Sequence, residues 1–239
     1  MKNMNTESET TELSVVDPSM SLVEAVSKRR SVRGFLDKEV PQQVINRIFE
    51  IAQQAPSNCN VQPWKAYVAS GELKESLKKK MYENTTNRVS PNPDYSYTNN
   101  FENEYRTRQV ECAVALYSKM GIGREDKEGR MRAVLRNFEF FDAPHIAFIG
   151  MDSSFGTTVA VDVGMWAQTL MLTMVAFGLH SCPMGTMRNY PDLVRQAFDV
   201  EDGTKILFGI SFGYEDSALP ANETRTTRDA TSSNVVFQS

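Results

Sequence analysis

The stretch VAVDVGMWAQTLMLTMVAFGL, residues 159–179, is apolar almost all round, and only Asp162, Gln168 and a few threonines interrupt it. A helix that is hydrophobic on every face must be covered on every face. We therefore expect a central helix with neighbours on both sides. A chain of this size with few strands has too little other surface to cover it. One face, with Trp166 in its seam, is therefore predicted to pack on a second copy in a homodimer.

The remaining elements are shorter and alternate irregularly between helix and strand. Ser21, with Glu24 three residues later, is typical of a capping box, and Pro41 is typical of a helix start. Apolar spacing predicts helices over 21–30, 41–56, 106–140 with a break at 121–123, and 190–198, and strands over 64–69, 145–150, 182–184 and 205–212. This order, in which helices dominate, predicts an α+β fold with a mixed sheet flanked by helices.

The chain is expected to form one domain, because 239 residues with 41% hydrophobic side chains suffice for one full core. Residues 1–20 are polar and are expected to form a flexible arm before a single domain over 21–239. Residues 83–105 lack helical periodicity and carry Tyr97 and Phe101. A loop of this length is usually functional or disordered, so we interpret it as an active-site lid. Residues 214–239 turn polar and are expected to form an extended tail.

Charge and composition exclude several classes of protein. A net charge of -4 argues against the broad basic field of a nucleic-acid binder. No apolar run approaches the roughly 20 residues that span a bilayer, and the first 20 residues lack a signal-peptide core. Three cysteines and two histidines at wide spacing fit reduced thiols better than disulfides or a metal site. The sequence therefore predicts a cytoplasmic protein with no metal, nucleic acid or membrane as partner.

The stretch SKRRSVRGF, residues 27–35, concentrates positive charge in one place. Its basic residues 28–30 fall in the last turn of a predicted helix, where cations also offset the helix dipole, so a solvated helix end is one explanation. That explanation leaves out Arg33, which lies beyond the helix. A guanidinium binds phosphate through a planar fork, so Arg29 and Arg33, with Ser31 between them, are candidates to hold one phosphate and part of its attached chain.

Two other stretches have the composition of a ring-binding site. In APSNCNVQPW, residues 55–64, prolines bracket a turn that exposes polar side chains, which suits the edge of a heteroaromatic ring; a helix stop with an Asx turn is the alternative. In SCPMGTM, residues 181–187, Pro183 removes a backbone donor and Gly185 allows close approach. That leaves an apolar shelf for a flat ring, with a turn packed by methionines as the alternative.

Together these stretches resemble one family. RRSVR near the start, PSN-N-QPW, D-G---Q-L in the apolar helix, CPMG and an arginine-bearing tail occur in the order found in the FMN-dependent nitroreductases of the oxygen-insensitive type. The resemblance covers about residues 21–236. It implies a homodimer whose long central helices pack together, with two FMN sites at the interface, each built from both subunits.

The resemblance also assigns FMN ligands by position. It implies that Arg29 and Ser31 bind the phosphate and ribityl chain, and that Arg33 reaches the ribityl or the pyrimidine edge of the ring. Arg30 belongs to the same motif. The tail sequence NETRTTRD places Arg225 and Arg228 where the family supplies further cations to the phosphate.

Other implied ligands hold the flavin ring. The turn lent by the second subunit corresponds to Pro56, Ser57, Asn58 and Asn60, with Gln62 following. The shelf beneath the ring corresponds to Pro183, Met184 and Gly185, with a backbone amide near Gly185 facing flavin N5. Many relatives carry a glutamate where this chain has Gly185, and the region around Asn137 does not align cleanly. Cys59 lies between implied ligands but has no matching histidine nearby to activate it.

The implied activity is an NAD(P)H-dependent nitroreductase. Hydride from NADH or NADPH reaches flavin N5, and a nitroaromatic or quinone acceptor then takes two electrons at the same face in a ping-pong cycle, because the flavin carries the chemistry. Tyr97 and Phe101 are expected to shape the choice of acceptor. Reductive dehalogenation or ene reduction on the same scaffold, and a flavin-binding module without turnover, are the alternatives.

Overall fold

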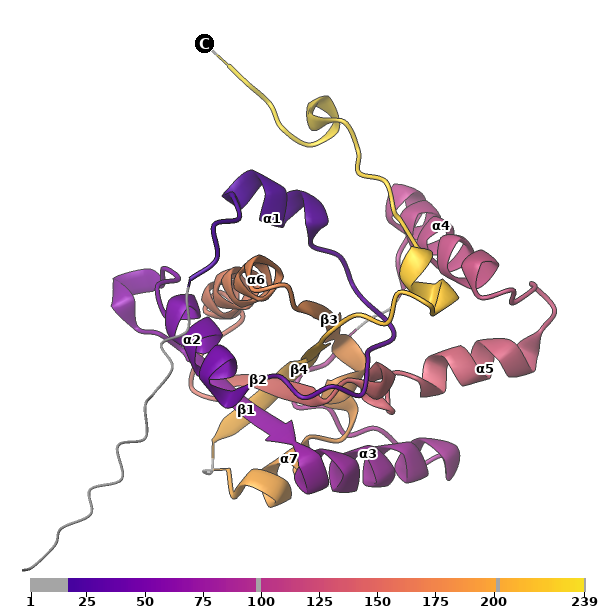
Figure 1. Ribbon diagram of the computed structural model, residues 1–239, viewed down its shortest axis with the longest axis horizontal. Helices are drawn as coiled ribbons and strands as arrows, with labels where there is room; N and C mark the ends of the chain where they lie inside the picture. The colour runs from indigo at the N-terminus through magenta and orange to yellow at the C-terminus, as the bar shows by residue number, and fades with distance from the viewer. Residues whose placement is uncertain (1–16, 98–99, 201–202, 239) are drawn as a thin grey trace, which may run out of the picture.

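The computed structural model describes residues 17–97, 100–200 and 203–238. A four-stranded sheet lies at its centre in the order β1-β2-β4-β3, built from β1 (Trp64–Ser70), β2 (His145–Asp152), β3 (His180–Met184) and β4 (Thr204–Gly213). Neighbouring strands are antiparallel, and a parallel bridge joins Ser31 to Ser181 beside β3. The α+β fold expected from the sequence is confirmed (Figure 1).

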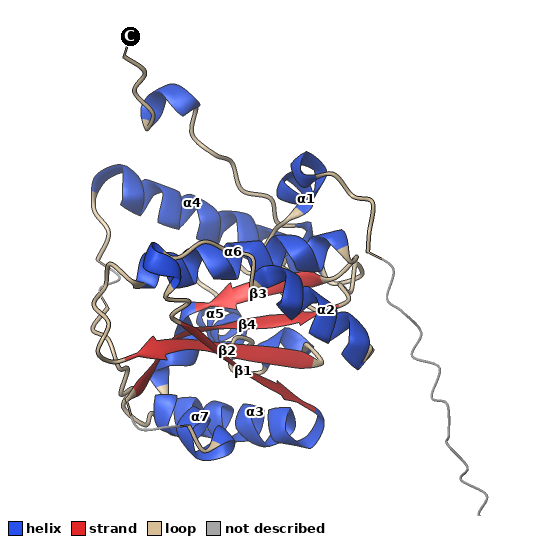
Figure 2. Ribbon diagram, turned by 90° about the vertical axis from the view of Figure 1, so that its left-hand side faces the viewer, coloured by secondary structure: helices blue, strands red, loops and turns tan. Residues whose placement is uncertain are grey.

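Helices cover both faces of this sheet (Figure 2). α6 (Ala160–Ala176) and α2 (Gln42–Ala52) lie on one face, and α3 (Gly71–Thr86) and α7 (Pro191–Phe198) lie on the other. β2 runs through the middle of the sheet, so Ile149 enters the core beneath α6 whereas Phe148 enters the core beneath α3. A strand with both faces covered has an almost continuous apolar sequence, as β2 does.

α6 is the predicted central helix, but one of its sides is bare in the single chain. Trp166 is fully buried, with its ring centroid 6.0 Å from that of Trp64 and 6.1 Å from that of Phe49. The prediction that Trp166 lies in a subunit seam is therefore wrong, because this side of α6 faces α2 and the sheet. The other side forms an exposed α6 stripe of Val161, Gly164, Met165 and Gln168.

The first two helices begin where the sequence predicts. The Ser21 hydroxyl caps α1 (Leu22–Lys28) by accepting a hydrogen bond of 3.2 Å from the Glu24 amide. The reciprocal half of the capping box does not form, because the Glu24 carboxylate pairs with Lys28 Nζ at 2.6 Å. α2 begins after Pro41 and ends at Ala52, several residues before Pro56.

The helices on either side of the predicted lid differ in part from the prediction. α3 was missed, because its sequence GELKESLKKKMYENTT is strongly polar and only Leu77 and Met81 supply buried apolar side chains. The predicted break near residues 121–123 is confirmed, since α4 (Asn103–Lys119) ends before it and α5 (Lys127–Leu135) follows. Residues 83–86 belong to α3 and 103–105 to α4, so the irregular part of the lid segment is shorter than predicted at both ends.

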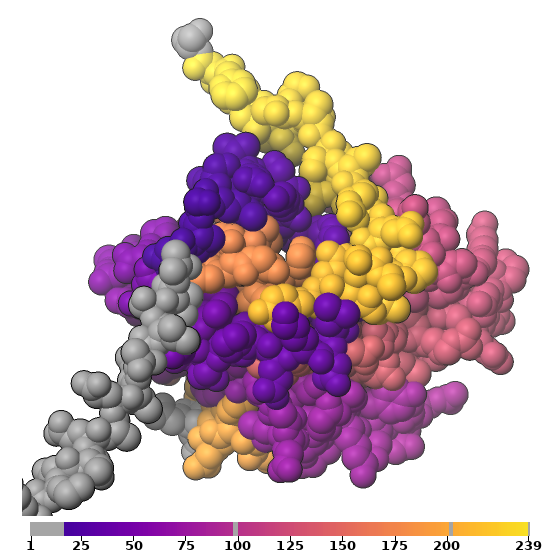
Figure 3. Space-filling model, viewed as in Figure 1, coloured from indigo at the N-terminus to yellow at the C-terminus, as the bar shows by residue number. Residues whose placement is uncertain are grey.

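The chain beyond β4 passes α4 and then runs away from the rest of the molecule (Figure 1). The predicted extended tail contains short 3-10 turns at Pro220–Glu223 and Thr231–Ser233. The space-filling view shows a hollow between α1, α6 and this tail (Figure 3). Within the described residues, no helix has the length and apolar character needed to cross a membrane.

Candidate functional site

The hollow is a cavity of about 1040 Å³ that gathers cations from both ends of the chain. The loop after α1 contributes Arg29, Arg30, Ser31 and Arg33, and the tail contributes Arg225 and Arg228. None of the described residues that line it is acidic. All six are among the FMN ligands that the family resemblance implied, with Arg30 included only as a member of the same motif, and they lie around one cavity.

Arg29 and Arg228 are close enough to repel one another. Burial lowers the pKa of the Arg29 guanidinium, and the charge of Arg228 lowers it further. Within the described part of the chain, Arg228 donates to backbone and hydroxyl oxygens of its own segment, including Thr227 O at 2.7 Å, and to no others. Like charges held together beside a cavity favour an anion between them, which is the arrangement that binds phosphate.

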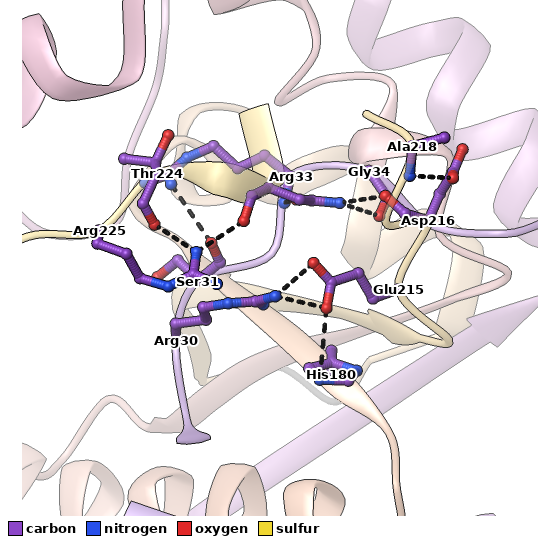
Figure 4. Close-up of polar contacts among 11 residues, drawn as sticks. Arg30, Ser31, Arg33, Gly34, His180, Glu215, Asp216, Ala218, Thr224 and Arg225 are labelled. Carbon is purple, nitrogen blue, oxygen red and sulfur yellow. Dashed lines mark hydrogen bonds and ion pairs between the residues drawn. The ribbon is translucent and has the colours of Figure 1, made fainter. Parts of the chain in front are cut away.

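Asn222 connects the cationic loop to the tail. Its Oδ1 accepts from the Arg33 amide at 2.7 Å, and its Nδ2 donates to Gly34 O at 2.8 Å and to Asp216 O at 2.9 Å. A buried amide with these bonds satisfied rigidifies the segments that it joins. Figure 4 shows the Arg33 segment and the tail lying side by side. Asn222 was not predicted from the sequence, because a single Asn in a polar tail gives no signal of such a role.

Arg30 differs from the other cavity cations because, among the described residues, it alone of the arginines there is paired with a carboxylate. Its Nη2 forms an ion pair with the Glu215 carboxylate, and Glu215 Oε2 lies 3.6 Å from His180 Nε2 (Figure 4). Burial lowers the pKa of His180, Arg30 acts in the same direction, and Glu215 opposes both. Arg30 Nη1 and His180 Nδ1 are buried without a hydrogen-bond partner among the described residues. Both residues line the cavity, where a polar ligand would satisfy them.

The predicted shelf is the end of β3, at the edge of the sheet, together with Gly185, which begins the 3-10 turn after it. The Val32 amide donates to Ser181 O at 3.0 Å, which fixes the cationic loop beside this strand. Pro183 and Gly185 are exposed, whereas the Met184 side chain is buried in the core, so Met184 can offer only its backbone to a ligand.

The predicted ring-edge turn lies apart from the cationic cavity. The Ser57 hydroxyl accepts from the Gln62 amide at 2.9 Å, and the Asn58 amide donates to Asp162 Oδ2 at 3.1 Å, which ties the turn to the first turn of α6. Pro56, Asn58, Asn60 and Gln62 are exposed. Asn60 and Gln62 have φ values of 57° and 50°, in the left-handed region that costs most residues energy and that often occurs at ligand sites.

Tyr97 and Phe101, the predicted lid residues, are both exposed. The base of their segment is fixed, because Asp94 accepts from the Ile206 amide at 2.7 Å and also pairs with Arg195. Whether this segment moves over a ligand stays a prediction.

The remaining polar candidates do not meet at one site. Asn137 Nδ2 donates to Val134 O of its own helix turn at 3.0 Å. The exposed Cys59 thiol contacts only its neighbour Asn58 at 3.6 Å. Cys182 is buried, and burial raises the pKa of its thiol to about 11 although Arg33 and Arg29 act in the opposite direction. The Cys182 thiol is therefore a poor candidate for a nucleophile at pH 7.

Comparison with known proteins decides the family. Residues 26–214 match the Nitroreductase family. The chain belongs to this family. It is 34% identical over 226 residues to the nitroreductase NfnB of Mycolicibacterium smegmatis, which covers 92% of this chain and 95% of that protein. It is 33% identical over 204 residues to a 4-nitrobenzoate reductase of Pseudomonas putida, which covers 85% of this chain and 89% of that protein.

The family assignment extends to the three-dimensional structure. The crystal structure of the FMN-dependent NfnB from Mycobacterium smegmatis, in complex with NADPH, superposes with a TM-score of 0.86 at 33% sequence identity. The match covers 92% of this nitroreductase family chain and 100% of that one.

Proposed function

We propose that this protein is an FMN-dependent NAD(P)H nitroreductase that reduces nitroaromatic compounds. The observation that carries the proposal is the cavity where Arg29 and Arg228, from opposite ends of the chain, meet without an acidic residue among those described. Relatives whose names specify nitroreductase and 4-nitrobenzoate reductase support the reaction, and a neighbour whose title specifies FMN and NADPH supports the cofactor and donor.

The residues of the cavity fit FMN. Its volume of about 1040 Å³ exceeds what the cofactor needs, and the buried unpartnered atoms Arg30 Nη1 and Thr224 Oγ1 call for a polar ligand. Arg29 and Arg228 would hold the phosphate, and Arg33 and Ser31 would hold the ribityl chain. The shelf at Pro183–Gly185, which does not itself line the cavity, would carry the ring.

FMN, when bound, supplies two-electron redox chemistry at its N5 position. The chain supplies orientation and electrostatics. Asn222 Oδ1 accepts from the Arg33 amide at 2.7 Å and so holds the Arg33 backbone in place. The Arg33 guanidinium would then extend from a fixed position toward a negatively charged edge of the ring. The overall reaction consumes one NAD(P)H and one proton for each two-electron step: the first converts the nitro group to nitroso with release of water, and the second converts nitroso to hydroxylamine. A ping-pong order and quinone acceptors belong to the same proposal.

The site is proposed to need two copies of the chain. The turn of Pro56, Ser57, Asn58, Asn60 and Gln62 does not line the cationic cavity of its own chain. The exposed α6 stripe offers an apolar surface between copies, and an isologous dimer would bring each turn toward the partner's cavity.

Two measurements on the purified protein test the proposal. The first is the flavin absorbance of the protein as isolated and after addition of FMN, which tests the cofactor. The second is anaerobic mixing with NADH or NADPH, followed by 4-nitrobenzoate, a quinone or an activated alkene. Rapid flavin bleaching and recovery with the nitroarene supports the proposal. Bleaching without recovery by the nitroarene, or flavin binding without bleaching, contradicts it and favours a different acceptor or a module without turnover.

A further inference from the structure

Arg188 lies beside the shelf, and its guanidinium has no counterion among the described residues. It follows Gly185 on the 3-10 turn of residues 185–189 and is half-buried. Its guanidinium carbon lies 3.6 Å from the centroid of the Tyr97 ring, a close cation–π contact. Within 17–97, 100–200 and 203–238 it has no hydrogen bond or ion pair, whereas nearby Arg195 pairs with Asp192 at 2.8 Å. The donors of Arg188 are thus available to an external ligand.

Gly185 makes room for this guanidinium. A Cβ atom on Gly185 would lie 3.2 Å from Arg188 Nη1, tighter than an ordinary contact. With no side chain at this position, Arg188 Nη1 lies directly beside the shelf backbone. The charge therefore lies beside the shelf that is proposed to carry the flavin ring.

The segment that carries Tyr97 is tied to the same turn as Arg188. The Asn92 amide donates to Asn189 O at 2.9 Å, and the Tyr190 hydroxyl donates to Val89 O at 3.2 Å. Arg188 and Tyr97 therefore belong to one hydrogen-bonded unit, although they lie far apart in the sequence. Stacking on Tyr97 restricts the rotamers of Arg188, which lowers the entropic cost of binding a ligand.

We propose that Arg188 is a specificity-determining residue that binds the carboxylate of an aromatic nitro acceptor at the shelf. This inference rests on the proposed function. The planar fork of a guanidinium matches a carboxylate through two parallel N–H···O bonds, and a neutral amide of the same shape cannot form the same charged pair. Tyr97 orients the fork and covers its other face. The enzyme therefore favours acceptors with a carboxylate on the ring over neutral acceptors of equal size.

The test compares 4-nitrobenzoate with the neutral 4-nitrobenzamide in wild type and Arg188→Gln. Loss of hydrogen bonds to a charged group lowers kcat/KM for 4-nitrobenzoate by about 10- to 150-fold. The value for 4-nitrobenzamide changes little. Arg188→Lys retains part of the preference, because it keeps the charge and loses the fork. Lys79→Gln, which removes the same charge from a side chain 76% exposed on α3, is the matched control and leaves both values unchanged.

Binding without turnover gives a second readout. Benzoate, which cannot be reduced, perturbs the flavin absorbance of wild type at lower concentration than benzamide, and Arg188→Gln removes this difference. Tyr97→Ala weakens benzoate binding by about two- to fivefold, because it removes only the cation–π contact. A smaller effect of Tyr97→Ala than of Arg188→Gln supports the assignment.

Several outcomes overturn the inference. If Arg188→Gln lowered kcat/KM equally for 4-nitrobenzoate and 4-nitrobenzamide, Arg188 would not distinguish acceptors by their charge. A loss seen with NADPH but not with NADH would assign Arg188 to the phosphate of the donor. If wild type binds benzoate through Arg188 but reduces neither nitro compound, the proposed function fails while the anion site stands.

Discussion

The Arg30 guanidinium forms an ion pair with the Glu215 carboxylate, joining residues 185 positions apart across the wall of the cationic cavity. Their side chains are 22% and 13% exposed, so neither charge is well solvated without the other. We predict that Glu215→Gln lowers the free energy of unfolding by about 1 to 3 kcal/mol, between the values for exposed and buried pairs. Urea denaturation measures this change.

A double-mutant cycle provides the control for that prediction. Arg30→Gln with Glu215→Gln removes both charges, so the double variant should lose less stability than the sum of the two single variants. Additive losses would mean that the ion pair contributes nothing to folding.

The proposed phosphate site predicts a loss of FMN without a loss of fold. Arg29→Ala combined with Arg228→Ala removes two charge-assisted contacts worth about 1.5 to 3 kcal/mol each, so FMN affinity should fall by orders of magnitude. Flavin fluorescence titration measures the affinity, and circular dichroism checks the fold. Lys79→Ala on the exposed face of α3 is the charge-matched control. If the double variant kept the wild-type affinity for FMN, these arginines would not be phosphate ligands.

The exposed α6 stripe predicts a dimer that can be broken without breaking the core. Met165 and Leu73 are both 37% exposed in the single chain, but Met165 lies on the stripe and Leu73 lies on α3. Met165→Glu should lower both the dimer fraction and FMN occupancy, because binding to the dimer alone links the two. Leu73→Glu should change neither. Sedimentation and flavin absorbance on one sample measure both properties, and a monomer with a full equivalent of FMN would contradict the shared site.

His145 predicts a loss of stability in acid. It is buried at the start of β2, its Nε2 accepts from the Val40 amide at 3.1 Å, and burial with the Lys74 charge lowers its pKa to about 4. The folded state therefore keeps His145 neutral while the unfolded chain binds a proton near pH 6.5. Stability is fully present above pH 6.5 and falls as the pH drops toward 4, by about 3 kcal/mol in total.

The comparison of wild type with His145→Gln isolates that effect. Glutamine can accept a hydrogen bond in place of the imidazole but does not titrate, so the slope of unfolding free energy between pH 6.5 and 4.5 should be shallower in the variant. Urea denaturation at several pH values measures the slopes. Parallel slopes would show that carboxylates, not His145, cause the acid sensitivity.

The sequence by itself determined the fold class, the central helix and the cationic loop. These features depend on local signals: an apolar run at residues 159–179, a capping serine at residue 21, and arginines near both ends of the chain. α3 escaped prediction because so few of its side chains are buried that its helical period is weak. Tertiary packing stabilises such a helix, and the local sequence pattern gives little indication of that packing.

Only the tertiary structure decided which side chains are buried and which partners they contact. It placed Trp166 in the core and Met165 on the bare face of α6, although they are neighbours in one apolar run. It paired Arg30 with Glu215 while leaving Arg188 without a counterion in the described part of the chain. Sequence shows that a charge or an apolar side chain is present. Its partner is set by contacts between distant segments, because burial and Coulomb energy depend on distance in space and not on separation along the chain.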